Sequence, residues 1–511
     1  MLLHEWLEMH ARERPTHLAL VCDSGRYTYH DIHERAQRLA ATLQARGLRR
    51  GDRVAIYLDN CAEAVIGIFA VLQAGAVFMP VNPQTKADKL TYLLNDSGAR
   101  ALISHGSLQE IVNKSLSNAP SIVTLVISEP TSTTVAGHTV LAFADATSGH
   151  DTPAFHVPPT IDQDLASIIY TSGSTGEPKG VMLSHLNMTS AATSISTYLG
   201  LRGDDIIFNV LPLAFDYGLY QVLMASRVGA RVVLHRSLAF PIKILEAMAR
   251  ERVTVLPFVP TAFSMMLNVS SLRSFDLSAL RIVTNTAAAL SEAHIRDIRA
   301  AFPQAQLFSM YGLTECKRVT YLPPDQLDIR PMSVGRGMPN EEVWLVGENG
   351  QRLPNGSVGQ LVVRGSNVMR GYWNKPEQTA ERLKPGEIPG EMYLYTGDIF
   401  RTDAEGYLYF VARKDDIIKS RGEKVSPREV ENVLHKLDGV LEAAVIGVPD
   451  DVLGQAVKAF LVLKPGHEMS ERDVIRFCLA HLESFMAPKH VQFVPQLPRT
   501  DTGKISKRGL A

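Results

Sequence analysis

Cysteine, net charge and long apolar runs are all scarce in this chain. Four cysteines stand far apart among 511 residues, with neither a CxxC pair nor histidines at metal-binding spacing. Such thiols are typical of reduced, mostly buried cysteines in a cytosolic protein. Lys and Arg number 52 against 53 Asp and Glu, a formal net charge of −1. The composition therefore gives no support to nucleic acid or an anionic membrane as a partner.

The chain also shows no uncharged stretch as long as a membrane span. Its start, MLLHEWLEMHARERP, lacks a basic region followed by a continuous apolar core, so it predicts an amphipathic helix rather than a signal peptide. There are no internal repeats and no low-complexity tracts. We expect a cytoplasmic protein without a membrane span.

What is present is an ordinary globular composition, with 45% hydrophobic residues, in a chain long enough for two or more domains. Short apolar runs such as RVAIYLDN and ARVVLHR alternate with longer amphipathic segments, which predicts an α/β fold built from βαβ units and parallel sheets. Within it, AVLQAGAVFMPVNP predicts a helix that ends near Gly75 and a strand stopped by Pro80 and Pro83.

The later part of the chain changes character. Strand-like runs separated by Asn-Gly and Gly pairs predict a β-rich subdomain within residues 334–412. A short charged segment, VARKDDIIKSRGEKV, reads as a hinge before a small α+β unit. We predict a large N-terminal domain, residues 1–412, and a small mobile C-terminal domain, residues 413–511.

The stretch YTSGSTGEPKGVMLSH, residues 170–185, has the composition of a phosphate-binding loop. It fails the Walker A pattern because its lysine follows Pro178, and it fails the GxGxxG fingerprint. Its glycines still free backbone amides, its hydroxyls add donors and Lys179 adds a positive charge. The run LASIIY before it predicts a strand, so the loop lies at a strand end, where ligands collect in α/β folds.

This stretch resembles the signature loop of the adenylate-forming superfamily, which includes acyl-CoA synthetases, luciferases and the adenylation domains of nonribosomal peptide synthetases. Further motifs follow in the family's order: YGLTE, SVGRGMPN, MRGYWNKPEQT, YTGD, RKDDIIKSRGEKVSPREVE and PRTDTGKISKRGL. The resemblance covers both predicted domains. It implies an ATP- and Mg²⁺-dependent enzyme that joins a carboxylic acid to AMP, releases pyrophosphate and then transfers the acyl group to a thiol.

The resemblance also assigns roles to individual residues. ATP would be held by Thr171, Ser172, Gly173, Ser174, Thr175, Gly176 and Lys179 at the phosphates, by Tyr311 at adenine, and by Asp398 and Arg413 at the ribose. Thr314 would touch the α-phosphate and Glu315 would bind Mg²⁺. Lys504 would bridge the substrate carboxylate and the α-phosphate. Asp415 would be the hinge between the two half-reactions, and Arg421 and Gly422 would line the pantetheine channel.

The acid is less well specified. The segment LPLAFDYGLYQVLMA resembles the substrate pocket, and its Asp216 matches the aspartate that pairs with an amino acid's ammonium in adenylation domains. Tyr217, Tyr220 and Phe258 could narrow the pocket around a small or cyclic side chain. YGLTECKRVTYLPP is similar to stand-alone prolyl ligases. Alternatively, Asp216 caps a helix, and some acyl ligases also have an aspartate here.

The main hypothesis is an aminoacyl-AMP ligase, with proline as the candidate amino acid, that loads the phosphopantetheine of a separate carrier protein, as in nonribosomal peptide synthesis. The alternative is an acyl-CoA ligase for a fatty or aryl acid, with coenzyme A as the acceptor. A hypothesis of another class is a non-enzymatic nucleotide-binding relative.

Overall fold

The computed structural model describes residues 1–149, 153–171, 177–286, 290, 292–420, 423–450, 453–482, 484–500 and 505–510. These residues form two compact units. The first unit contains Met1–Pro331, Arg336–Glu342 and Val363–Leu394, and the second contains Met332–Gly335, Val343–Val362 and Tyr395–Ala511. The predicted division at residues 412 and 413 stays a prediction.

The first unit holds two sheets, each of nine strands among the described residues. The order of the first is β17 (Arg336–Gly337), β16 (Thr320–Leu322), β15 (Gln306–Tyr311), β14 (Ile282–Asn285), β13 (Val255–Phe258), β11 (Ile206–Asn209), β12 (Arg231–Leu234), β1 (Leu18–Cys22) and β2 (Gly25–Thr28). The order of the second is β20 (Gly371–Tyr372), β10 (Lys179–Ser184), β9 (Leu165–Thr171), β4 (Val77–Val81), β3 (Arg53–Tyr57), β5 (Ala101–His105), β6 (Thr124–Ser128), β8 (His138–Ala142) and β7 (Thr134–Val135).

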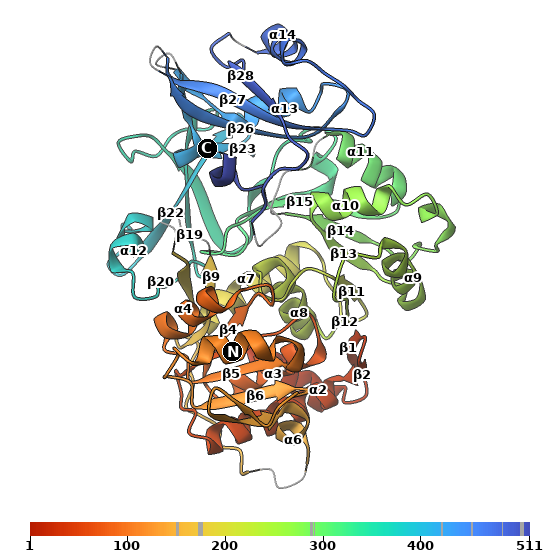
Figure 1. Cartoon of the computed structure of the whole chain (residues 1–511), viewed down its shortest axis with the longest axis vertical. Helices are drawn as coiled ribbons and strands as arrows, with labels where there is room; N and C mark the ends of the chain where they lie inside the picture. Colours follow the sequence, from red (N-terminus) through yellow and green to blue (C-terminus); the bar gives the residue numbers. More distant parts are fainter. Residues whose placement is uncertain are drawn as a thin grey trace. The chain divides into compact units, whose positions relative to one another are not determined.

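The central strands of both sheets are parallel, and antiparallel pairs occur toward the edges. Helices occupy the connections between them, as Figure 1 shows. They are α1 (Leu3–Glu13), α2 (Tyr29–Ala45), α3 (Ala62–Gln73), α4 (Ala87–Ser97), α5 (Gln109–Leu116), α6 (Phe143–Thr147), α7 (His185–Tyr198), α8 (Asp216–Val228), α9 (Pro241–Glu251), α10 (Pro260–Leu267), α11 (Glu292–Ala301) and α12 (Pro376–Arg382). The predicted α/β class is confirmed.

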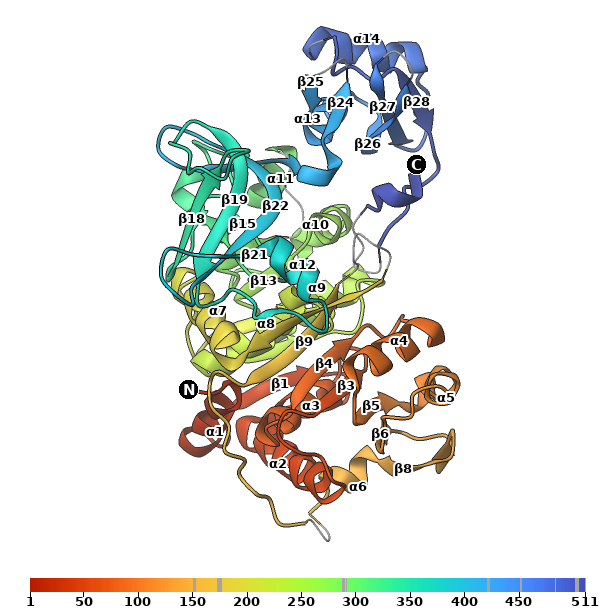
Figure 2. The ribbon, with the colours of Figure 1, turned by 90° about the vertical axis from the view of Figure 1, so that its left-hand side faces the viewer.

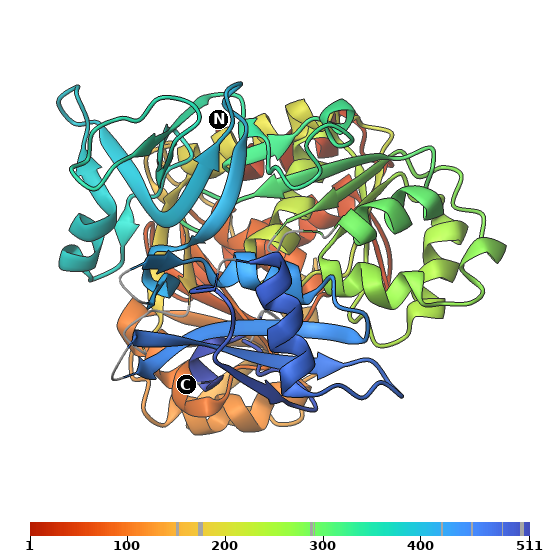
Figure 3. The same cartoon turned by 90° about the horizontal axis from the view of Figure 1, so that it is seen from above.

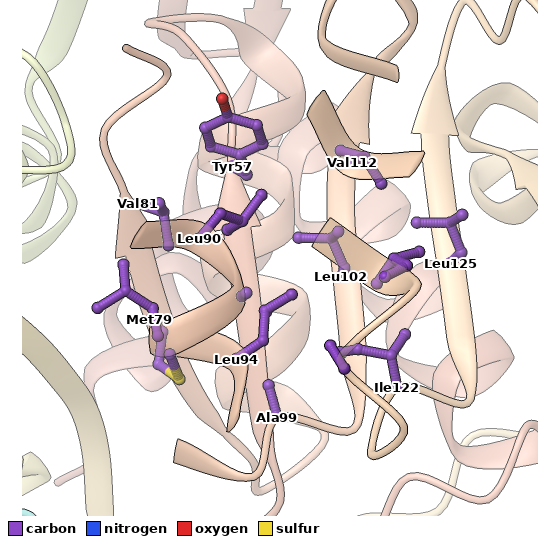
Figure 4. Packing of buried hydrophobic residues seen from close by; sticks show 14 of the residues in the cluster. Tyr57, Met79, Val81, Leu90, Leu94, Ala99, Leu102, Val112, Ile122 and Leu125 are labelled. Carbon is purple, nitrogen blue, oxygen red and sulfur yellow. The ribbon is translucent and has the colours of Figure 1, made fainter. Parts of the chain in front are cut away.

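Helices cover both faces of the second sheet, as Figure 2 shows for β3, β5 and β6. On one face, Leu90 and Leu94 of α4 pack with Val112 of α5 over alternate strand residues such as Tyr57 and Leu102, seen closely in Figure 4. All five side chains are fully buried. On the other face α3 approaches the sheet. Burial of both faces explains why these strands read as continuous apolar runs in the sequence.

The connection from α3 to β4 shows one difference from expectation. The helix ends at Gln73 and Gly75 has φ +70°, as expected, but Pro80 lies inside β4 rather than ending it. The Val77 N–H donates to Asp52 on the β3 side, so the backbone nitrogen of Pro80, which is three residues further, faces β9. Because β4 pairs with β9 only at Phe78, the missing N–H of Pro80 costs no ladder hydrogen bond.

Two further sheets follow. One has the order β18 (Glu341–Val346), β19 (Val358–Gly365), β22 (Met392–Thr402) and β21 (Leu383–Pro385), with β23 (Leu408–Arg413) also beside β22. The other has the order β25 (Glu423–Val425), β24 (Ile418–Ser420), β27 (Gly454–Leu463) and β26 (Val440–Asp450), with β28 (His490–Phe493) also beside β27. The predicted β-rich stretch and the C-terminal α+β pattern are therefore present.

The C-terminal sheet belongs to the second unit and has a core on each face. Helices α13 (Pro427–Leu434) and α14 (Glu471–His481) bury Val430 and Val474 against one face. Figure 3 shows these helices and strands in blue. Leu497 packs on the opposite face with Phe460. In the part of the chain that the structure describes, no helix is long and apolar enough to cross a membrane.

Candidate active site

The predicted phosphate loop connects two antiparallel strands. Thr171 ends β9 and Lys179 begins β10, and the two residues pair across the hairpin. The loop therefore does not open a helix as a Walker A loop does. Residues 172–176, which carry the predicted Ser172, Gly173, Ser174, Thr175 and Gly176, lie outside the described residues.

Side chains from outside the loop bind its stems. The Tyr170 hydroxyl donates to the Asp96 carboxylate over 2.6 Å, and the Trp373 indole N–H donates to the Asp96 carbonyl over 2.9 Å. The Tyr92 hydroxyl donates to the Pro178 carbonyl over 3.2 Å. Both loop stems are thus fixed to α4. The sequence predicts no role for Asp96 or Tyr92, because neither residue belongs to a recognisable motif.

Tyr372 joins the loop stem to the YGLTE motif. Its hydroxyl donates to Glu315 Oε1 over 2.7 Å, and Lys179 Nζ lies 5.5 Å from the centroid of its ring. Burial and the Glu315 carboxylate hold the pKa of Tyr372 well above its usual range, so the hydroxyl keeps its proton and remains a donor. The structure therefore brings together the predicted Lys179 and Glu315 through a residue that sequence reasoning missed. The only available signal was a tyrosine in the motif MRGYWNKPEQT.

The turn that carries Thr314 and Glu315 is tightly built. It follows β15, whose last residue is Tyr311, and the Lys317 N–H donates to the Leu313 carbonyl over 2.7 Å. Lys317 has φ +71°, a left-handed conformation that costs a non-glycine residue about 1 kcal/mol. A Cβ on Gly312 would lie 2.1 Å from the Lys317 carbonyl oxygen, so glycine is required there.

The carboxylate of Glu315 is suited to Mg²⁺. Its residue is half-buried and its second oxygen is not used by Tyr372. Among the described residues there is no group of three or more His, Cys, Asp or Glu that could hold a metal ion. A single carboxylate such as that of Glu315 is nevertheless enough for Mg²⁺, since the ion keeps several waters and takes one or two carboxylates together with substrate phosphates. The residues present fit a nucleotide-bound Mg²⁺ rather than a metal held by protein alone.

Asp216 lies at the centre of a polar group that we call the Asp216 cluster, composed of Asp216, Tyr217, Tyr220, Lys317 and Arg318. Asp216 is the first residue of α8, where the helix N-terminus favours a carboxylate. Its Oδ1 lies 3.5 Å from Lys317 Nζ, and 1% of the Lys317 side chain is exposed against 21% for Asp216. The cation beside Asp216 is therefore supplied by the chain itself.

The aromatic members of the cluster are fixed by backbone contacts. The Tyr217 hydroxyl donates to the Thr284 carbonyl over 2.8 Å, and the Arg318 guanidinium lies 5.1 Å from the Tyr217 ring centroid. Tyr220 is fully buried, as is Phe258, whose ring packs edge-on against Phe263. The role of Tyr217, Tyr220 and Phe258 in narrowing a pocket stays a prediction.

Two buried cations follow Glu315 directly. Lys317 Nζ and Arg318 Nε are buried atoms without a hydrogen-bond partner among the described residues. At 3.5 Å, Lys317 and Asp216 form an ion pair but no well-aligned hydrogen bond. Burial lowers the pKa of Lys317, and the Asp216 carboxylate opposes that shift.

The segment bearing these cations is held by two polar side chains. The Asn367 amide donates to the Cys316 carbonyl over 2.8 Å and to Glu341 Oε2 over 2.9 Å. Burial raises the pKa of Glu341 well above its usual range. These contacts fix the backbone from which Lys317 and Arg318 project.

The second unit carries the predicted ribose contacts. Asp398 of β22 and Arg413 of β23 are direct partners in an antiparallel pair. The Asp398 N–H donates to Thr396 Oγ1 over 3.1 Å, and the whole YTGD motif lies within β22. The backbone of the predicted hinge residue Asp415 lies in the 3₁₀ turn Lys414–Asp416. The predicted Arg421, Gly422 and Lys504 lie outside the described residues.

Comparisons with known proteins show the family of the chain. Residues 7–373 match the AMP-binding enzyme family and residues 429–504 match the AMP-binding enzyme C-terminal domain. The chain belongs to the AMP-binding enzyme family. It is an AMP-forming, ATP-dependent acid–thiol ligase of the adenylate-forming superfamily, whose members use ATP and Mg²⁺.

Several relatives are named for the acid that they activate. The chain is 32% identical to a long-chain-fatty-acid–CoA ligase of Bacillus subtilis (strain 168), across 94% of this chain and 89% of that protein. It is 34% identical to a feruloyl-CoA synthase of Amycolatopsis sp, across 99% and 97%.

Solved structures show the same similarity. The anthranilate CoA ligase AuaEII in complex with anthranoyl-AMP has a TM-score of 0.89 at 29% identity, over 100% of this chain and 96% of that one. ATP-bound MatB from Rhodopseudomonas palustris has a TM-score of 0.88 at 30% identity, over 100% and 98%.

The predictions of acid adenylation, ATP and Mg²⁺ are thereby confirmed. The finer prediction of an amino acid passed to a carrier protein is not shown, and the relatives support the CoA-ligase alternative better.

Proposed function

We propose that this AMP-binding enzyme is an acid–CoA ligase for a fatty or aryl acid. The observation that carries the proposal is similarity over at least 94% of the chain to relatives named as CoA ligases for such acids. The Asp216–Lys317 ion pair adds support, because an aspartate that already has a cation is a poor counter-ion for an amino acid's ammonium.

In the first half-reaction a carboxylate oxygen of the acid attacks the α-phosphorus of ATP and pyrophosphate leaves. Both reactants are anionic, so positioned cations and amides lower the barrier. Lys179, at the base of the loop, would hold the departing phosphates, while Thr314 would contact the α-phosphate. Mg²⁺, when bound with ATP, would neutralise phosphate charge beside Glu315. We assign to Lys504 the role of neutralising the negative charge that develops between the carboxylate and the α-phosphate.

In the second half-reaction the thiol of coenzyme A attacks the acyl carbonyl and AMP leaves. Asp415 would act as the hinge between the two steps, and Arg421 and Gly422 would lie along the pantetheine arm. Asp398 and Arg413 would hold the ribose of AMP during both. These roles are carried over from the family motifs to the matching positions of this chain.

The experiment that tests the proposal combines ATP–pyrophosphate exchange with detection of acyl-CoA, across fatty acids, aryl acids and amino acids. We expect exchange and a CoA thioester with one group of fatty or aryl acids. Lys504→Ala should abolish exchange while ATP binding remains measurable. Exchange with amino acids alone, or with no acid at all, would refute the proposal.

A further inference from the structure

Asp216 is a carboxylate whose charge is already balanced. Its side chain is 21% exposed, and Lys317, almost completely buried, places an ammonium 3.5 Å from it. No other ion pair of Asp216 occurs in the part of the chain that the structure describes. The nearby Arg318 lies over the Tyr217 ring instead. A ligand that reaches Asp216 therefore meets an ion pair and not a free carboxylate.

The position of the Lys317 ammonium is built into the backbone. The left-handed conformation of Lys317 places its carbonyl against Gly312, and Asn367 binds the preceding carbonyl of Cys316. The side chain is therefore not a surface lysine that can move to solvent. It also reaches the ring of Tyr220, whose centroid lies 5.9 Å from Nζ. The Lys317 ammonium could move away from Asp216 only if the backbone of this turn changed its conformation.

The Asp216 cluster adjoins the reacting centre, because Lys317 is two residues from Glu315 in the same tight turn. An ammonium brought to this place by a ligand would be repelled by Lys317, and Asp216 could not compensate both charges. A ligand without an ammonium avoids this repulsion. The two buried cations of the turn instead have N–H donors that an oxygen could accept from.

We propose that Lys317 is a specificity-determining residue whose resident ammonium neutralises Asp216 and excludes acids that carry an α-amino group. The inference rests on the proposed acid-ligase function and deepens it by naming the substrate class. The enzyme selects acids with no ammonium beside the reacting carboxylate.

The test uses acid pairs that differ only in the amino group or ring nitrogen: 3-phenylpropanoate with phenylalanine, 4-methylpentanoate with leucine, and cyclopentanecarboxylate with proline. ATP–pyrophosphate exchange gives kcat/KM for each member of a pair with the full-length wild type and with Lys317→Met. We expect the wild type to favour the nitrogen-free acid at least tenfold. Lys317→Met frees Asp216 and should move that ratio at least tenfold toward the amino acid.

Two further variants separate charge from packing. The double variant Asp216→Asn with Lys317→Met removes both charges, and we expect its ratio to return toward that of the wild type. Lys464→Met is the matched control, because Lys464 also lies 3.5 Å from an aspartate, Asp438, but both side chains are largely exposed. Its ratio should equal that of the wild type.

The outcomes distinguish this inference from the proposed function. A wild type that favours the amino acid, or a folded Lys317→Met enzyme with an unchanged ratio, contradicts the role of Lys317. If Lys317→Met does not fold, the double variant, which lacks both charges, provides the test. A shift of its kcat/KM ratio toward the amino acid would contradict the inference. Absence of exchange with every acid in the wild type would instead contradict the ligase proposal itself.

Discussion

Replacing Tyr372 by Phe tests the geometry that joins the loop stem to Glu315. The substitution removes one hydroxyl, which donates to Glu315 Oε1 over 2.7 Å, and keeps the ring beneath Lys179. A hydrogen bond to a charged group contributes about 2 kcal/mol, and the site is partly shielded from water. If Glu315 must be held for adenylation, the loss corresponds to about a 30-fold fall in the exchange rate.

The assay is ATP–pyrophosphate exchange with a good acid substrate at varied Mg²⁺ concentration. A Glu315 carboxylate that is no longer oriented should bind the ion less well, so half-maximal activity should require more Mg²⁺. The control is Tyr409→Phe, which also removes a tyrosine hydroxyl from a carboxylate, that of Asp403 at 3.2 Å. Exchange by Tyr372→Phe within twofold of the wild type, with the same Mg²⁺ dependence, would refute the reasoning.

Three further predictions concern stability. Burial lowers the pKa of His4 to about 4 and that of His185 to about 3, so only the unfolded chain takes up these protons near pH 5. The free energy of unfolding should therefore fall as pH decreases below about 6.5, by about 2 kcal/mol per histidine at pH 5. In urea unfolding, His185→Asn should make the free energy of unfolding depend less steeply on pH. Gly312→Ala places a Cβ 2.1 Å from a backbone oxygen, so we expect a loss of about 1–3 kcal/mol, seen as a lower thermal midpoint. Gly67→Ala should not lower the midpoint, because its Cβ would meet only ordinary contacts, the nearest at 3.4 Å.

Each has a contradicting result, which for Gly67→Ala is a lower midpoint than that of the wild type. A pH slope unchanged by His185→Asn would show that its burial does not control acid stability. Equal midpoints for Gly312→Ala and the wild type would show that the turn can widen without cost, and the account of the Lys317 conformation would be wrong.

The sequence was sufficient for the fold class because the patterns that predict it are local. Apolar runs of strand length alternate with amphipathic segments, and this pattern alone predicts parallel sheets covered by helices. The prediction that Pro80 ends the strand was wrong, because a proline interrupts a strand only where its nitrogen faces a paired neighbour. The nitrogen of Pro80 faces β9 beyond the point where β4 and β9 pair. Pairing between strands distant in the chain leaves no mark on the proline itself.

The candidate site was predictable only where a motif names its residues. Glu315 and Lys179 belong to recognisable motifs, and the structure links them through Tyr372. The partner of Asp216 was not predictable, because Lys317 reaches it only through a left-handed turn that no propensity favours for lysine. An unpaired aspartate therefore suggested a substrate ammonium, whereas in the structure the ammonium belongs to the chain.

The most direct test of the account is the fate of the acyl group when the enzyme is given ATP, Mg²⁺, coenzyme A and a panel of fatty and aryl acids. We predict AMP release that depends on coenzyme A, matched by an equal amount of acyl-CoA detected by mass spectrometry. Acid-dependent pyrophosphate exchange without any CoA thioester, together with acylation of a carrier protein's phosphopantetheine, would contradict it.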